Sequence, residues 1–190
     1  ENAPQTYATI TKYFVIFGSF ICLGVIVFAD ILKLILVPKE TYWDAMDVVP
    51  LIVLANFFLG IYTNLSVWYK LIDKTRVGAY ISIVGAIVTL ILNLILIPMI
   101  SYMGSAIATI LAYGTMMFIS YYMGQKKYPI PYDKKSIFTY LGLAIVLSGI
   151  SFYVPILRET YVFGIAAILF FAYFVYRNEK ETILTIIRRK

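Results

Sequence analysis

The sequence predicts an all-α membrane protein with six transmembrane helices. Of the 190 residues, 62% are hydrophobic and 14% are charged, whereas soluble domains are about half apolar and about a quarter charged. The charged residues gather in short segments, and the uncharged stretches between them have the ~20 residues that a helix needs to cross a bilayer. This pattern excludes a soluble globular domain and a disordered chain. A single cysteine also excludes a disulfide scaffold.

Each expected span is an apolar stretch flanked by charged residues. The stretches cover 13–29, 48–69, 77–125, 136–157 and 160–176. The stretch 77–125 is long enough for two helices at ~1.5 Å per residue, which brings the number of spans to six. Pro98 and Gly104 bound the segment PMISYMG, where we expect the turn between these two helices.

Basic residues predict the orientation of these spans. With the N-terminus in the cytoplasm, the segments 1–12, 70–76, 124–135 and 177–190 are cytoplasmic. All 16 basic residues except Lys33, Lys39 and Arg158 then lie on the cytoplasmic side. We therefore expect both termini inside. The net charge of +6 is accounted for by basic loops facing anionic lipid, so no nucleic-acid partner is expected.

Polar side chains inside the spans are the candidates for a solute path. Asn56, Thr63 and Asn64 fall on one face of the second span, and Asn93 lies in the third. Because an amide is costly in hydrocarbon without a polar partner, this face should point toward protein or a water-filled cavity. Hydrogen bonding between helices, with no contact to a solute, is the alternative interpretation.

Small residues recur along the third and fourth spans and indicate close packing of two antiparallel helices. The residues in question are Gly78, Ser82, Gly85, Gly104, Ala108 and Ala112.

Few residues offer enzymatic chemistry. Histidine is absent, and the single Cys22 lies between apolar neighbours. Three acids, Glu40, Asp44 and Asp47, occur together in one short segment and are the candidates for a glycosyltransferase-like site. A solvated face is the other interpretation of this segment. We expect no enzyme, no bound metal and no cofactor.

Asp30 is the one acid that could lie in the hydrocarbon region, and it is the candidate for coupling transport to an ion. It stands three residues before Lys33, so an ion pair at the membrane interface is the alternative. The apolar ILKLILV after Asp30 is expected to continue the first helix into the headgroup region.

Residues 65–114 carry a resemblance to a known family. WYKLIDKT at 68–75, LNLILIP at 92–98 and MGSAIAT at 103–109 occur in the order and spacing found in polysaccharide-type flippases. The sequence thus resembles the multidrug/oligosaccharidyl-lipid/polysaccharide (MOP) exporter superfamily, and YYMGQKKYPIPY at 121–132 is similar to its members as well.

This resemblance implies a partial MOP/MATE-like bundle. Residues 1–124 would form four helices of the C-terminal lobe, and residues 125–190 an extra helix pair with a basic cytoplasmic tail. The implied function is to flip a lipid-linked oligosaccharide across the bacterial inner membrane by alternating access, in O-antigen, lipopolysaccharide or capsule biosynthesis. The first lobe would precede Glu1, and glycosyltransferases or a polysaccharide polymerase would be partners, beside membrane lipid.

The resemblance also bears on the residues at the inner mouth. Family cavities are often cationic, which suits an anionic pyrophosphate, but the spans here contain no central Lys or Arg. Lys70, Lys74 and Arg76 lie at the cytoplasmic mouth, where they would attract a headgroup or simply fix the topology. Three alternatives remain: a MATE-like multidrug antiporter, a membrane glycosyltransferase or polymerase, and a structural membrane subunit.

Overall fold

Helices account for all of the regular structure in the described part of the chain. The computed structural model describes residues 3–37 and 39–188, apart from the side chains of residues 44 and 181–188, and it contains no strand within them. In chain order the elements are α1 (Ala3–Val27), α2 (Ala29–Leu36), the 3-10 helix η1 (Glu40–Val48), α3 (Val49–Leu65), α4 (Val67–Leu71), α5 (Arg76–Lys127), α6 (Lys134–Tyr153), α7 (Pro155–Thr160) and α8 (Val162–Arg188).

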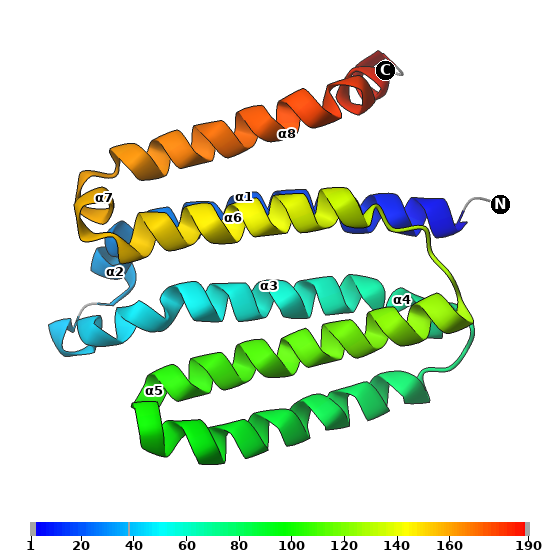
Figure 1. Cartoon of the computed structure of the whole chain (residues 1–190), viewed down its shortest axis with the longest axis horizontal. Helices are drawn as coiled ribbons and strands as arrows, with labels where there is room; N and C mark the ends of the chain where they lie inside the picture. The colour runs from blue at the N-terminus through cyan, green and yellow to red at the C-terminus, as the bar shows by residue number, and fades with distance from the viewer. Residues whose placement is uncertain (1–2, 38, 189–190) are drawn as a thin grey trace.

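The long helices lie side by side along one direction (Figure 1). Helix α1 packs against α3, α6 and α8, while α3 packs on its other side against α5. Both termini lie at the same end of the bundle, which we call the proximal end. Helices α2 and α7 lie at the opposite, distal end. The alternation of helix directions that the charge pattern predicts is therefore present in the fold.

Five helical segments in the described residues are long and apolar enough to cross a membrane. They are Ala3–Val27, Glu40–Leu71, Arg76–Lys127, Lys134–Tyr153 and Val162–Lys180. The sequence predicts six, and α5 accounts for the difference. Its 52 residues would extend roughly 78 Å if straight, more than twice the ~30 Å of a bilayer core.

Helix α5 consists of two arms that fold back on each other (Figure 1). The helical backbone is broken at Ile100 (φ −135°, ψ 20°) and Ser101 (φ 53°, ψ −136°), inside the segment expected to turn. Pro98 has no N–H to donate and its ring disfavours a regular helix just before this point. We call residues 76–99 the first arm and 102–127 the second arm.

Gly104 allows the two arms to meet directly after the reversal. A Cβ at this position would lie 2.6 Å from both the carbonyl carbon and the oxygen of Leu96. Backbone atoms cannot move aside as a flexible side chain can, so only glycine fits without shifting one arm.

We expect Gly104→Ala to lower the free energy of unfolding by about 1–3 kcal/mol, the usual cost of overpacking. Gly142→Ala in α6 is the matched control, because a Cβ there meets nothing within 4 Å. The control should be neutral or slightly stabilising, since alanine favours a helix over glycine. Thermal unfolding of the two variants in detergent measures the difference, and equal midpoints would contradict the close approach of the arms.

One expectation about the end of a helix is corrected. The first span does not continue as one helix past Asp30, because the backbone departs from helical geometry at Phe28 (φ −96°, ψ 15°) and α2 begins anew at Ala29. This break brings Asp30 to the loop around α7. Helix α6 packs against α1 as well as α8.

The core lies where α1, α3, α6 and α8 meet. Val15, Leu23 and Phe171 are fully buried there, and Tyr140 is 2% exposed. The first arm of α5, in contrast, presents large apolar side chains outward, including Leu94 at 70% and Met99 at 73% exposure. Soluble proteins rarely expose continuous apolar surface of this kind, so these side chains face lipid or further protein.

Candidate functional site

The charged side chains at the distal end form a compact cluster around Asp30. Arg158 donates from Nε to Oδ2 of Asp30 at 2.6 Å and from Nη2 to Oδ1 at 2.7 Å. Lys33 Nζ lies 3.4 Å from the same carboxylate, and Arg158 Nη1 lies 3.7 Å from Asp47. This distal cluster joins α2, η1 and α7. The sequence indicated the Lys33 pair but not Arg158, which lies 128 residues away in the chain.

The distal cluster keeps Asp30 ionised. The hydrogen bonds from Arg158 lower the pKa of Asp30 below its usual value of 3.8, against the opposing effect of burial, and Lys33 adds to the lowering. The same contact raises the pKa of Arg158. A carboxylate held by two cations in this way has little capacity left to bind a transported proton or sodium ion.

Asp30→Asn should lower the free energy of unfolding by about 1–2 kcal/mol at pH 7, a value discounted for the partial exposure of the pair. Because the folded-state pKa is lowered, the contribution is present above the unfolded-state value of 3.8 and is lost as the pH falls through the folded-state value. The unfolding midpoints of wild type and variant in detergent should therefore differ at pH 7. They should converge only as the pH falls below 3.8 and through the lower folded-state pKa of Asp30.

Asp73→Asn is the control for this experiment, since Asp73 is exposed and its backbone conformation (φ 53°) also suits asparagine. It should leave the midpoint at pH 7 unchanged. A gap between wild type and Asp30→Asn that persists undiminished at acidic pH would contradict the ion pair.

A second polar cluster lies near the proximal end, around the buried carboxylate of Glu179. Glu179 of α8 has a side chain only 5% exposed, and its Oε1 lies 2.6 Å from Nζ of Lys12 in α1. Tyr140 of α6 donates its hydroxyl to the same oxygen at 2.9 Å. Lys12 is also 3.3 Å from Asp133, the residue that caps the start of α6 by accepting from the Ser136 N–H. This proximal cluster ties α1, α6 and α8 together.

The proximal cluster was not predicted, because the charge pattern places Lys12 and Glu179 in flanking cytoplasmic segments. The spacing of residues in α8 is the feature of the sequence that could have indicated this cluster. Phe171, Val175 and Glu179 stand four residues apart and so share one helix face, and Phe171 is fully buried. A buried acid needs a basic partner, and Lys12 occupies the corresponding face of α1 with Val15 and Ser19.

The predicted polar face of the second span exists on α3. Asn56 and Thr63 are exposed on one side of α3, and Asn64 is half-buried beside them. Asn56, Thr63 and Asn64 each donate to the backbone carbonyl four residues earlier, at 2.8, 2.9 and 3.0 Å. Asn93, the candidate in the third expected span, lies on the first arm of α5, with a buried Oδ1 that accepts no hydrogen bond from the described residues.

The predicted basic residues of the cytoplasmic mouth, and one of the predicted packing residues, are exposed. Lys70, Lys74 and Arg76 are exposed at the proximal end, around the turn from α4 to α5. Among the small residues Ser82 is exposed and so does not belong to the packed stripe.

The remaining small residues are buried where helices meet. Gly78 lies against Tyr69, and Gly85 against Met116 of the opposite arm. Gly104 lies against Leu96, and Ala108 and Ala112 are fully buried.

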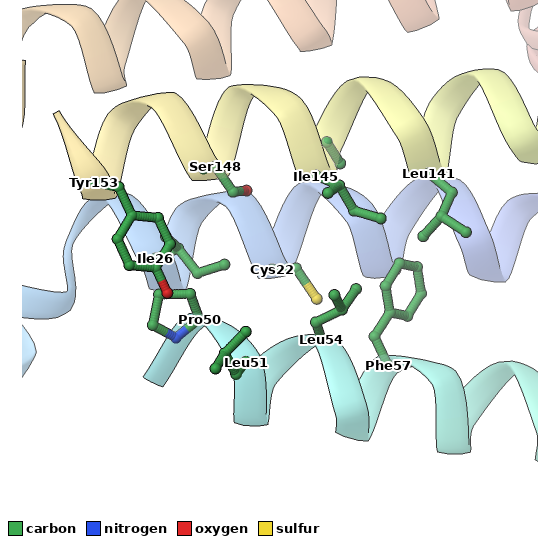
Figure 2. A pocket seen from close by; sticks show the side chains of 12 residues that line it. Cys22, Ile26, Pro50, Leu51, Leu54, Phe57, Leu141, Ile145, Ser148 and Tyr153 are labelled. Atoms are coloured by element: carbon green, nitrogen blue, oxygen red, sulfur yellow. The ribbon is translucent and has the colours of Figure 1, made fainter. Parts of the chain in front are cut away.

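The interior cavities offer apolar surroundings. One of about 110 Å³ lies between α1, α3 and α6, where Cys22 and Leu54 face each other and Phe57 points toward Leu141 (Figure 2). A larger one of about 230 Å³ near the proximal end is lined mainly by apolar and aromatic side chains, with Lys134 among the lining residues. Cavities of this composition suit hydrocarbon groups and offer no nucleophile with a paired base.

The acidic segment that was the candidate for a glycosyltransferase-like site forms η1. Glu40 is exposed, the side chain of Asp47 is 57% exposed, and the side chain of Asp44 lies outside the described residues. Within the described residues no three His, Cys, Asp or Glu side chains are grouped closely enough to hold a metal ion.

Comparisons with known protein families, with curated proteins and with solved structures find no match for this chain. The geometry of the described residues and the motifs at 65–114 are therefore what indicates a function. The arrangement provides charged clusters that fasten helices at both ends, apolar cavities between them and one exposed polar face on α3. These features suit the passage or binding of a solute.

Proposed function

We propose that this chain is the C-terminal part of a transporter that flips lipid-linked oligosaccharides across the bacterial inner membrane. In this proposal the two arms of α5 cross the membrane separately, so the chain has six spans in a MOP-like arrangement. Further spans outside these 190 residues would supply the opposing lobe. The position of both termini at the proximal end, beside the basic segments, supports a cytoplasmic location for that end.

The exposed polar face of α3 is the observation that carries the proposal. Asn56 stands seven residues into α3, or roughly 10 Å from its first residue, so in this proposal it lies inside the hydrocarbon region. Helix α3 is otherwise packed between α1 and α5. An amide in the middle of the membrane costs several kcal/mol of free energy unless water or a polar group covers it. The bond from Asn56 to the Ile52 carbonyl uses one of the two amide N–H groups, and a water-filled path along this face would serve the other N–H and the amide oxygen.

The charge distribution suits an anionic headgroup. Lys70, Lys74 and Arg76 are exposed at the proximal mouth and would raise the local concentration of a pyrophosphate-linked substrate. The glycan would then pass along the polar face while the polyprenyl chain stays in lipid. The resemblance of 65–114 to polysaccharide-type flippases supports the same substrate.

Complementation with the full-length gene tests the proposal. The gene should restore surface glycan to a bacterial strain that lacks its own flippase. The double variant Asn56→Leu/Thr63→Val should lose at least about tenfold of that activity, since each removed polar group is worth about 1 kcal/mol or more to a passing headgroup. The amount of protein in the membrane should not change.

Thr139→Val is the matched control, because Thr139 is an exposed helix threonine that makes the same local hydrogen bond as Thr63. It should complement fully. Normal surface glycan in a host from which the gene and any redundant flippase have been deleted would refute the proposal. Full activity of the double variant would refute the path along α3.

The alternative functions receive less support from the geometry. A MATE-like antiporter needs a carboxylate available to an ion, and Asp30 is held by Arg158 and Lys33. A glycosyltransferase or polymerase would have to use the exposed Glu40 and Asp47 of η1. We therefore retain the flippase as the proposal.

A further inference from the structure

An open hollow of about 670 Å³ lies at the distal end of the bundle, beside the distal cluster. Its walls combine five charged side chains with three aromatic rings and a proline. They are Asp30, Lys33, Asp47, Phe152, Tyr153, Pro155, Arg158, Glu159 and Tyr161. This volume is in the range of sites that hold a small organic ligand.

The basic residues of the hollow are already engaged. Arg158 is bound to Asp30 through two nitrogens, and its guanidinium lies over the ring of Phe152 at 4.1 Å. Lys33 pairs with Asp30 and lies 4.6 Å from the ring centre of Trp43. Two basic and three acidic side chains give the lining a negative balance. A phosphate or another anion is therefore disfavoured here.

A metal ion is disfavoured as well. Asp30 accepts from two cations, so it cannot also coordinate a divalent ion without losing them. The remaining acids, Asp47 and Glu159, are two ligands at most.

The lining instead suits a ligand with many hydroxyl groups and an apolar ring face. The carboxylates of Asp47 and Glu159 accept hydrogen bonds, and Arg158 retains N–H groups that can donate them. The hydroxyl of Tyr153 lies 3.4 Å from the carbonyl of Asp47, so this ring stands at the wall shared with the apolar cavity of Figure 2. Aromatic rings with a polar tip, as in Tyr153 and Tyr161, cover one face of a ring-shaped ligand while bonding its edge.

We propose that this hollow binds an uncharged saccharide unit. The choice of a saccharide over other hydroxyl-rich ligands rests on the proposed function, which brings an oligosaccharide to this end of the molecule. Tyr161 provides one aromatic face of the site, and Glu159 accepts from the sugar hydroxyls.

Saturation-transfer NMR on the purified protein in detergent tests the site without any transport. The ligands are maltotriose, chitotriose, glucose and galactose, with inorganic phosphate as the anionic probe. At least one sugar should show transfer from the protein, and phosphate should neither bind nor compete.

Tyr161→Gly is the informative variant. Tyr161 has φ 53°, a left-handed backbone that glycine adopts without strain, so this change removes the ring while preserving the turn. Combined with Glu159→Gln it should weaken sugar binding about tenfold. Tyr42→Ala, an exposed aromatic at the same end that does not line the hollow, should bind as wild type does.

Loss of binding in the double variant with retention in Tyr42→Ala supports the site. Absence of transfer to every sugar, unchanged binding in the double variant, or displacement of sugar by phosphate would each overturn it. Sugar binding in a protein that fails to restore surface glycan would refute the proposed function and leave the site in place. Restored surface glycan without sugar binding by the purified protein would refute the proposed site and leave the proposed function in place.

Discussion

Lys12→Met is expected to lower the free energy of unfolding by about 3–5 kcal/mol, because it leaves a buried carboxylate without its counter-charge. Glu179 has a side chain 5% exposed, and Lys12 is its cationic partner at 2.6 Å. The hydroxyl of Tyr140 alone cannot compensate for the lost charge. Unfolding of the protein in mixed detergent micelles, followed by circular dichroism, measures the loss.

The double variant Lys12→Met/Glu179→Gln separates the charge from the packing. It removes both charges but leaves an amide oxygen that can still accept from Tyr140. Replacing both members of a buried pair is often nearly neutral, so most of the lost stability should return. A double variant as unstable as Lys12→Met would show that the stem of Lys12, and not its charge, stabilises this contact.

Trp68→Ala is expected to cost about 3–5 kcal/mol of stability, as is usual when a large buried side chain is truncated. Trp68 is 1% exposed, and its indole N–H donates to the carbonyl oxygen of Ser120 at 3.0 Å. The ring also covers Gly124, where a Cβ would lie 2.7 Å from the indole. This side chain therefore fastens α4 to the second arm of α5 at the proximal end.

Two companion variants identify the source of the effect. Trp68→Phe fills most of the space and removes the donor, so it should cost about 1–2 kcal/mol. Tyr80→Ala, which truncates an aromatic side chain that is 67% exposed, should change stability by less than about 0.5 kcal/mol. Chemical unfolding of the three variants gives these values, and equal losses for Trp68→Ala and Tyr80→Ala would be inconsistent with a buried anchor.

Much of the helical architecture can be predicted from where the charges lie. The turn expected between Pro98 and Gly104 contains the reversal at Ile100 and Ser101. The alternation of basic and non-basic segments places both termini at one end, as the fold does. The break at Phe28 could not be predicted, because the sequence on both sides of it is equally apolar and nothing local ends the helix.

The candidate sites are less predictable, since each depends on residues from distant helices. Asn56 and Thr63 share a face by helical spacing alone, so the sequence is enough to group them. Asn93 was expected in the third span as a further cavity candidate, and only the fold shows that its amide oxygen is buried. The sequence does not predict the pair between Arg158 and Asp30, because an ion pair between residues 128 apart produces no pattern in the local spacing of residues.

The sequence by itself determines that the described chain is helical, apolar enough for a membrane and divided into antiparallel segments. These properties follow from composition and from charges at the ends of each segment, which are local. Only the tertiary structure decides which face of each helix meets another helix and which faces outward. The physical reason is that lipid is as apolar as a helix interface, so hydrophobicity does not distinguish the two faces. The pairs Asp30–Arg158 and Lys12–Glu179, which fasten the two ends of the bundle, therefore emerge only once the helices are packed.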